Sequence, residues 1–467
     1  MTFSSVQSVV SRAGHDGAGQ VDRREYWAHA VLVATVCGLA GFYLWRGTLA
    51  PSAPAAARGA STWMGVDRWA GLGLAWRWVF PGLALVAGLI VARRPGACRR
   101  LAGRVGTAAG LTPVRLAVAM ASVPMFWLAS NRQHNPDGSM FEEKFVAAAG
   151  HGGAFTTYDE LLEFYLHSRL WAVVNPLWGW DVTTTYRVVS CVAGGVAVFV
   201  GLGLVRRFPS TRGPLVVAGL FAGGWVLVFF GDIENYTLTN VMVLGYLVAA
   251  LRFLDDERSP LWPVGVLLGI AVAFHLQALT LAPSLLVLAG IAVRRNRHRD
   301  AVAALAAVPL LLGAVIGWLA IHGLPSSGLA TSQITADGGD WSRYLAPANG
   351  RYFWLQWQLL VLLAPAVVLV PALLVREAAA AGRARMVFLA VAAGGPLLMM
   401  AVWRAQLGIY EDWNLYAIVA QPIGLLVFGG LAGQSRLARQ APWLTALIVL
   451  AATQAGAWIG SHATATG

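Results

Sequence analysis

Long apolar runs dominate this sequence, and they constrain its fold more than any other feature. Each run holds about 20 residues with few charges, which is the length of helix that crosses a bilayer. Backbone groups in a bilayer core must be satisfied internally, so such runs predict helices rather than open sheets. We therefore predict an all-α fold, a polytopic membrane helical bundle. The predicted spans, about 13 transmembrane helices, are 27–47, 72–93, 112–130, 186–205, 214–231, 236–253, 260–275, 277–293, 301–322, 353–375, 384–403, 413–431 and 442–460.

The apolar stretch 260–293 is too long for one span. The segment Phe274–Gln277 interrupts it with a histidine and a glutamine. We therefore predict two short helices that meet at the membrane surface, with His275 at their junction.

Composition supports a membrane protein. Hydrophobic residues make up 57% of the 467 residues and charged residues only 12%, whereas soluble domains carry about 25% charged residues. The net charge is +12, but the basic residues form short clusters between apolar runs. That pattern sets membrane topology, so we predict no nucleic-acid partner. The three cysteines are scattered and indicate neither a disulfide framework nor a metal framework.

Charge asymmetry predicts the orientation of the chain in the membrane. With the N-terminus inside, 23 of the 34 Lys and Arg residues fall on the inner side and 14 of the 22 Asp and Glu residues on the outer side. Basic residues are enriched in cytoplasmic loops, so we predict a multi-pass protein of the cytoplasmic (inner) membrane. The first apolar run lacks a small-residue cleavage site at its end, which indicates an uncleaved helix.

The predicted spans and loops divide the chain into three parts. Residues 1–26 form a cytoplasmic tail, and residues 27–111 form two N-terminal spans and a basic cytoplasmic loop. Residues 112–467 form the main transmembrane module, whose largest outer segment is 131–185. A second outer segment, 323–352, is rich in Gly, Ser and Asp and is a candidate flap.

The large outer loop is predicted to lie on the membrane as amphipathic surface helices. Phe155–Leu170 has apolar residues at helical spacing, and Thr156 or Thr157 is a candidate cap. The tryptophan residues after this segment are of the type that is enriched in the headgroup region of a bilayer. We interpret four acids of this loop as plain markers of helix ends: Asp159, Glu160, Glu163 and Asp181.

Acidic residues also gather in three short outer elements beside predicted helix ends. Carboxylates at this depth are costly to desolvate unless they face water, a partner or a ligand, so these elements are candidate functional segments. Their residues are Asp137, Glu142 and Glu143 after the third span, Asp232, Glu234, Asn235 and Tyr236 in a tight turn, and Asp412 and Trp413 at the start of a later span.

These elements resemble the GT-C superfamily of membrane glycosyltransferases, in particular uncharacterised bacterial members. The similar phrases are Gly231–Tyr236, Glu411–Tyr416 and His275–Pro283, in a region that covers about residues 112–430. The resemblance implies an enzyme that takes a sugar from a polyprenyl-phosphate carrier and attaches it to an acceptor outside the cytoplasmic membrane. In the family the acidic loop usually follows the first span, whereas here it follows the third. An added pair of N-terminal spans would preserve the sidedness.

Sugar transfer requires groups that the outer segments contain. For a hexosyl- or pentosyltransferase of GT-C type, Asp137 is the candidate general base toward the acceptor hydroxyl, and Glu142 is the competing candidate. Arg404 is the first candidate for the departing phosphate, because the guanidinium binds phosphate through two parallel donors. The other candidate substrate contacts are Glu143, Asp232, Glu234, Asn235, Tyr236, His275, Arg343, Arg351, Asp412 and Trp413.

The expected partners follow from the resemblance. They are a polyprenyl-phosphate-sugar donor lipid, an acceptor that is a glycan, a lipid or a protein, and the surrounding membrane lipids. A divalent cation, Mg or Mn, is an optional cofactor held by oxygen ligands. Its candidate ligands are Asp137, Asp232 and Glu234.

Two other classes stay open on the sequence. An envelope polysaccharide polymerase or ligase also acts outside, but would rest on Arg and His in a large late outer loop, and segment 323–352 has two Arg and no His. A secondary transporter should show broken helices and mid-membrane charges in repeated halves. The acids of this chain lie at one predicted surface, which favours the transferase.

Overall fold

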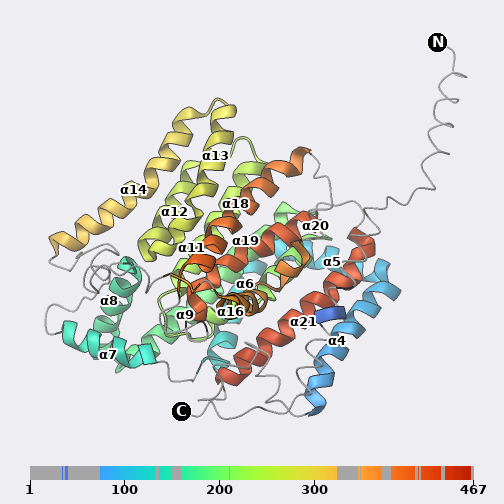
Figure 1. Ribbon diagram of the computed structural model, residues 1–467, viewed down its shortest axis with the longest axis horizontal. Helices are drawn as coiled ribbons and strands as arrows, with labels where there is room; N and C mark the ends of the chain where they lie inside the picture. Colours follow the sequence, from blue (N-terminus) through green and yellow to red (C-terminus); the bar gives the residue numbers. More distant parts are fainter. Residues whose placement is uncertain are drawn as a thin grey trace, which may run out of the picture.

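The computed structural model is a bundle of helices in which the N-terminal and C-terminal parts of the chain lie together. In Figure 1, α12, α13 and α14 form one side of the bundle, α4 packs beside α21 on another, and α11, α18 and α19 lie between them. Within the described residues the only β-type contact is an isolated bridge between Leu345 and Trp403. The structure describes residues 34, 37–39, 74–131, 136–149, 159–209, 211–322, 345–347, 349–370, 380–404, 409, 412–432 and 437–463.

The apolar runs of the sequence form the helices of the bundle, with short 3₁₀ segments (η) between some of them. In chain order they are α4 (Leu74–Arg93), α5 (Pro95–Gly110), α6 (Thr112–Leu128), α7 (Pro136–Ala149), α8 (Leu161–Trp178), α9 (Val182–Leu202), η2 (Gly203–Arg207), α10 (Gly213–Phe221), η3 (Gly224–Phe229), α11 (Thr237–Asp255), α12 (Trp262–Phe274), η4 (Leu276–Leu281), α13 (Ala282–Arg294), α14 (His298–Ile321), α16 (Gly350–Leu363), η6 (Pro365–Leu369), α18 (Ala380–Val402), η7 (Trp413–Val419), α19 (Ala420–Gly424), the π-helical η8 (Leu425–Gly429), α20 (Gly430–Ala432) and α21 (Leu437–Ala463).

The all-helical membrane architecture is confirmed, but the count of about 13 spans is not. Seven helices are long and apolar enough to cross a membrane, or eight if α5 and α6 form one broken span, and two shorter apolar helices accompany them. These counts concern the described residues only, and the predicted span 27–47 lies largely outside them. The predicted split of 260–293 corresponds to α12 and to the continuous helix Leu276–Arg294 formed by η4 and α13.

The predicted span 214–231 is not one helix. It forms α10 and η3, separated at Gly223, where a Cβ would overlap the Leu363 carbonyl oxygen. Every residue of η3 is buried. Hydropathy misled the prediction here, because a segment buried in protein is as apolar as one that faces lipid. The run 353–375 likewise stops being α-helical at Leu363, just before Pro365, whose ring cannot continue the helical hydrogen bonds.

Two amphipathic segments also differ from their predicted form. The basic stretch after α4 is the helix α5 rather than a loop, and it meets α6 at an angle of 92°. The surface helix predicted over Phe155–Leu170 is α8, which begins at Leu161 and extends to Trp178; the candidate caps Thr156 and Thr157 lie outside the described residues.

The same helices place acidic and basic residues at opposite ends of the bundle. Helix α11 begins after the turn Asp232–Tyr236 and ends at Asp255, which pairs with Arg385 at the start of α18. The segment of η7, α19, η8 and α20 begins after Asp412, and its last residue, Ala432, accepts a hydrogen bond from Arg212 at 2.6 Å. We call the first end the acidic end, defined by Glu160, Asp232, Glu234, His275 and Asp412, and the other the basic end, defined by Arg207, Arg212, Asp255, Arg297, Asp300 and Arg385.

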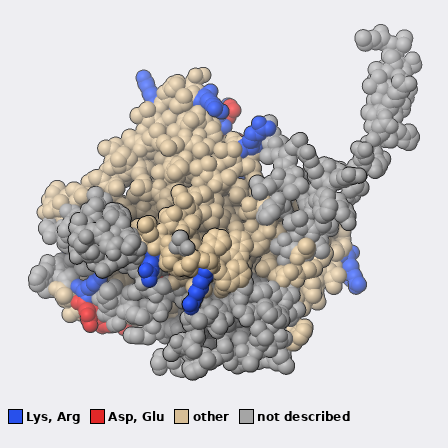
Figure 2. Space-filling view, viewed as in Figure 1, with Lys and Arg blue, Asp and Glu red and all other residues tan. Residues whose placement is uncertain are grey.

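Charge is distributed over the surface in agreement with a membrane-crossing bundle. Figure 2 shows described charged side chains along the upper edge and in the lower part of the view, with a broad uncharged surface between them. Large apolar side chains are exposed on the lipid-facing helices, such as Leu310 at 69% on α14 and Leu398 at 64% on α18. In water such a surface would be unfavourable, whereas in lipid it is the expected one.

One close contact fixes α18 against the junction of α12 and α13. A Cβ at Gly395, within α18, would overlap the Thr280 carbonyl oxygen of η4. The absence of a side chain at Gly395 therefore lets the two backbones approach. This contact sets the position of η4, which begins directly after His275.

Candidate functional site

The acidic turn between η3 and α11 is held by contacts of its backbone to two elements, the end of α6 and helix α9. Gly231 has φ +70°, and a Cβ there would approach Ser130 Cβ to 2.8 Å, so only glycine fits. Its N–H donates to Ser190 Oγ at 3.0 Å. The Asn131 N–H donates to the Phe230 carbonyl at 2.6 Å. These contacts bring the end of α6 beside the turn that carries Asp232.

The residues of this turn are almost completely buried. Asp232 is 3% exposed, Glu234 6%, Asn235 1% and Tyr236 8%. Two acids this deep are costly unless the fold or a ligand needs them there. The tight turn that the sequence predicts is therefore packed inside the protein rather than open on its surface.

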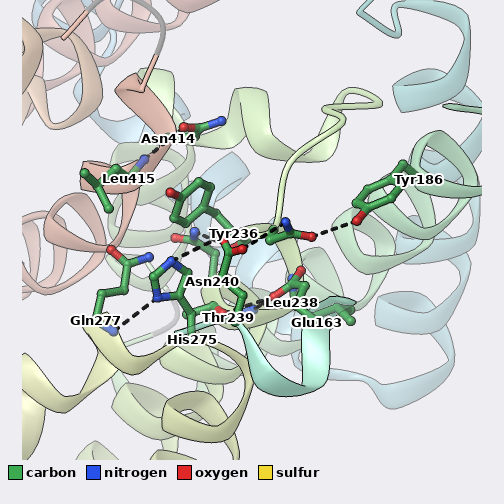
Figure 3. A network of polar contacts seen from close by, with 12 residues as sticks. Glu163, Tyr186, Tyr236, Leu238, Thr239, Asn240, His275, Gln277, Asn414 and Leu415 are labelled. Carbon is green, nitrogen blue, oxygen red and sulfur yellow. Dashed lines mark hydrogen bonds and ion pairs between the residues drawn. The ribbon is translucent and has the colours of Figure 1, made fainter. Parts of the chain in front are cut away.

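A chain of side-chain contacts joins this turn to α8 and α9. Tyr186 Oη donates to Asn235 Oδ1 at 2.9 Å. Asn235 Nδ2 donates to Glu160 Oε2 at 3.3 Å. Because both ends of the amide are engaged, its orientation is fixed. Figure 3 shows Tyr186 and the other labelled residues of this network of polar contacts.

His275 lies on the other side of Glu160. Its Nδ1 accepts the Gln277 backbone N–H at 3.2 Å, so the neutral ring carries its proton on Nε2. Nε2 lies 3.7 Å from Glu160 Oε1, which is longer than a hydrogen bond. Burial lowers the pKa of His275 to about 3. The imidazole is therefore neutral at physiological pH, and it stacks on the Tyr236 ring at 4.9 Å between centroids.

Glu163 was interpreted from the sequence as a plain marker of a helix end, and the structure gives it a different position. Its side chain is fully buried, and its carboxylate accepts the Leu238 N–H at 2.9 Å and the Thr239 hydroxyl at 3.1 Å. It thus caps α11 from α8, where the positive helix N-terminus favours an anion. Burial raises the pKa of Glu163 more than the hydrogen bonds to the carboxylate lower it, and the resulting pKa is about 7.

Asp159, Glu160 and Asp181 were also interpreted from the sequence as markers of helix ends. Two of these acids support the fold, and one belongs to the candidate site. Asp181 does mark a helix end, because it caps α9 by accepting the Thr184 N–H at 2.6 Å. Asp159 joins α8 to η4 through its carbonyl, which accepts the Leu276 N–H at 2.8 Å. Glu160 belongs to the network described above.

A further element, η7, reaches the turn from a distant part of the sequence. Asn414, in η7, donates from Nδ2 to Asp232 Oδ2 at 3.2 Å. Burial raises the pKa of Tyr236 well above its ordinary value, and the nearby charges of Glu160, Glu234 and Asp412 raise it further. The structure therefore brings together residues from five segments: the start of α8, α9, the turn before α11, the α12–η4 junction and η7.

Several candidate residues lie away from this network. Glu142 and Glu143 are exposed on α7, whose buried face carries Phe141 and Phe145. Their predicted contact with substrate stays a prediction, and neither side chain belongs to the buried network. Trp413 packs its ring on Trp458 at 4.7 Å between centroids and is a core residue.

The remaining candidates are placed only in part. Asp137 is in the first turn of α7, but its side chain is outside the described residues, as is all of Arg343. Arg404 is exposed just after α18, and the preceding Trp403 carbonyl accepts the Tyr416 hydroxyl at 2.9 Å. Arg351 is exposed in the first turn of α16.

The candidate metal site is supported only by its two buried carboxylates. Within the described residues, no group of three His, Cys, Asp or Glu side chains is arranged to hold a metal ion. Asp232 and Glu234 are described, whereas the Asp137 side chain is not. The metal remains an expectation from the sequence.

Sequence reasoning missed three residues of the network. Tyr186 lies within an apolar span, and Asn414 and Gln277 are uncharged residues in helical segments. The one available signal was their position beside charged or histidine residues in otherwise apolar runs. Their partners are 49 residues away for Tyr186 and 182 for Asn414, which sequence spacing does not reveal.

A solved structure with a similar fold is the crystal structure of ArnT from Cupriavidus metallidurans bound to undecaprenyl phosphate. The alignment has a TM-score of 0.54 and covers 76% of this chain and 77% of that chain, at 12% sequence identity. The likeness shows that the two chains share a fold over most of their lengths. No protein-family model and no curated protein sequence matches the chain.

Proposed function

We propose that this protein is a membrane glycosyltransferase that uses a polyprenyl-phosphate-linked sugar as its donor. It transfers a hexose or pentose to a hydroxyl of a glycan, a lipid or a protein on the outer side of the cytoplasmic membrane. The observation that carries this proposal is the buried network at the acidic end, built from five separate segments, in a fold shared with a protein that binds undecaprenyl phosphate.

The acidic end suits a sugar better than it suits the lipid phosphate. Glu160, Asp232 and Glu234 supply carboxylate oxygens, and Asn235 and Asn414 supply amides. Carboxylates accept hydrogen bonds from sugar hydroxyls, whereas they repel a phosphate. The neutral His275 adds no positive charge that would offset this repulsion.

We assign the general base to Asp137. The Asn131 N–H contact places the chain beside the acidic turn, and Asp137 follows six residues later. Six residues span at most about 20 Å, so Asp137 is within reach of the turn. In the reaction, Asp137 accepts the proton of the acceptor hydroxyl as its oxygen bonds to the anomeric carbon. The bond from that carbon to the phosphate oxygen breaks, and polyprenyl phosphate leaves.

The departing phosphate requires positive charge at the edge of the acidic end. Arg404 is the candidate, since it follows Trp403, whose carbonyl is bound by Tyr416 two residues after Asn414. A guanidinium binds phosphate oxygens through two donors and stabilises the charge that develops on them. An exposed position suits this role, because the lipid phosphate arrives at the membrane surface.

The lipid that copurifies with the protein tests this proposal most directly. Mass spectrometry of an organic extract should detect a polyprenyl phosphate or its glycoside. The purified protein in nanodiscs should also transfer labelled sugar from an undecaprenyl-phosphate sugar to an acceptor hydroxyl. Absence of the lipid together with uptake of a solute into proteoliposomes would instead indicate a transporter.

A further inference from the structure

The side chain of Gln277 has no hydrogen-bond partner within the described part of the chain. Neither its Nε2 nor its Oε1 has a partner, and the residue is only 6% exposed. Its backbone is fully engaged: the N–H donates to His275 Nδ1, and the carbonyl accepts the Thr280 hydroxyl at 2.7 Å. Only the amide is left unsatisfied.

An unsatisfied buried amide is unfavourable in the folded protein. Each buried polar group without a partner costs about 1–3 kcal/mol, and buried groups of this kind in native proteins usually have a reason. A leucine or methionine would fill the same space at lower cost. The amide therefore points to a partner that arrives from outside the chain.

The position of the amide identifies the part of the molecule that such a partner enters. Gln277 is two residues from His275, which contacts Glu160 and stacks on Tyr236. Figure 3 shows the Gln277 side chain beside the His275 ring, extending in the direction of Tyr236. The amide thus belongs to the acidic end rather than to the lipid-facing surface.

An amide has both a hydrogen-bond donor and an acceptor, and this property distinguishes the phosphate of the donor lipid from its sugar as the partner of Gln277. A phosphate accepts hydrogen bonds but donates none at neutral pH, so it would satisfy Nε2 and leave Oε1 facing negative charge. The negative charges of Glu160, Glu234 and Asp412 also act on Tyr236 and raise its pKa, and negative charge opposes a phosphate here. A hydroxyl both donates and accepts, and adjacent sugar hydroxyls satisfy both ends of one amide.

We infer that Gln277 binds a hydroxyl of the donor sugar through its side-chain amide and that this contact determines which sugar the protein accepts. The inference rests on the proposed function and extends it to a residue that charge patterns do not reveal. A site built to bind a substrate hydroxyl rejects analogues that lack the hydroxyl, because its own polar group then stays unsatisfied.

The test compares Gln277→Met with Gln421→Met. Both residues are buried glutamines, but Gln421 Nε2 donates to Asn240 Oδ1 at 2.9 Å. Gln421→Met should lower the thermal midpoint, because it leaves Asn240 without that donor. Gln277→Met should leave the midpoint unchanged or raise it, because it removes an unsatisfied group.

Binding and turnover complete the test, with undecaprenyl phosphate alone and with undecaprenyl-phosphate hexoses and pentoses as probes. Gln277→Met should bind bare undecaprenyl phosphate like the wild type. For the preferred sugar its kcat/KM should fall roughly tenfold, the loss expected for one hydrogen bond, and its discrimination among sugars should shrink by a similar factor.

The outcomes separate the two proposals. Unchanged selectivity among sugars, or a loss of stability equal to that of Gln421→Met, would overturn the role of Gln277 while leaving the transferase intact. A wild-type protein that neither binds undecaprenyl phosphate nor transfers any of these sugars would reject the proposed function itself, and the sugar contact with it.

Discussion

The two ends of α11 hold acidic residues in different ways. At the basic end, Asp255 pairs with Arg385 and lies 3.9 Å from Arg207, and Asp300 pairs with Arg297 while it caps α12. At the acidic end, Asp232 accepts from an amide, and Glu163 from backbone and hydroxyl groups. A carboxylate beside an arginine is largely neutralised and serves packing. The carboxylates described here at the acidic end instead accept hydrogen bonds from an amide, a hydroxyl and a backbone N–H, and a sugar hydroxyl is a donor of the same neutral kind.

The difference between the acidic end and the basic end has a functional meaning only if the two ends face opposite sides of the membrane. We expect a cysteine at Glu142, near the acidic end, to react with an impermeant thiol reagent in intact cells, and a cysteine at Arg299, near the basic end, to react only after permeabilisation. Both side chains are exposed, so access to the reagent alone decides the result. The background should have the native cysteines replaced by serine. Labelling at 299 without labelling at 142 would reverse the orientation and reject an outward-facing site.

The next largest effect is expected at the general base. Asp137→Asn keeps the size of the side chain and removes its ability to accept a proton, so turnover should fall by roughly 10²–10⁴. Binding of undecaprenyl phosphate should be retained, because contacts to the phosphate and the prenyl chain are unchanged. Glu142→Gln, on the exposed face of α7, is the matched control. Near-normal turnover in Asp137→Asn beside an inactive, well-expressed Glu142→Gln would transfer the role to Glu142.

A smaller effect compares the two ends of one helix directly. Asp232→Asn should reduce kcat/KM roughly 10- to 100-fold, with binding and turnover weakened together, if Asp232 accepts hydrogen bonds from the sugar. Asp255→Asn, at the basic end, should leave transfer unchanged and cost about 1 kcal/mol of stability or less, as expected for partly exposed ion pairs. Equal losses of activity in both variants would mean that the two ends do not differ in function.

The smallest effect concerns stability as pH changes. Burial raises the pKa of Glu163 from 4.5 to about 7. Between these values the folded protein keeps a proton that the unfolded chain releases, so this residue makes stability fall as pH rises through the window. His167 stays neutral throughout, because burial lowers its pKa to about 4. Glu163→Gln should remove up to roughly 3 kcal/mol of the change in unfolding free energy across this window, so the thermal midpoint should depend less on pH. An unchanged slope would show that Glu163 is ionised in the folded protein.

Sequence patterns predicted the helices well because hydropathy reports burial from water. The starts of α6, α11 and α21 lie within about five residues of the predicted spans. Hydropathy does not distinguish a segment that faces lipid from a segment buried inside the protein. For this reason residues 214–231 were predicted as one span, whereas they form α10 and η3. Hydropathy also carried no information on the bend between α5 and α6.

The candidate site was predictable where charge interrupts an apolar run and was missed elsewhere. Asp232 and Glu234 stand out in the sequence for this reason, and the structure buries both of them in the turn before α11. Glu163 looked like an ordinary first-turn acid, because its partner Leu238 lies 75 residues away. Gln277 lies beside His275 in an apolar run, but that position does not reveal an unsatisfied amide, which depends on the residues that surround it in space.

The contact between α18 and η4 limits how this protein can change during evolution. Any side chain at Gly395 would overlap the carbonyl oxygen of Thr280. Thr280 lies in η4, the short helix that also holds Gln277. A descendant that alters its sugar preference can replace Gln277 in one step. It cannot replace Gly395 without displacing η4 from α18. We therefore expect lineages to diverge at 277 while they retain glycine at 395.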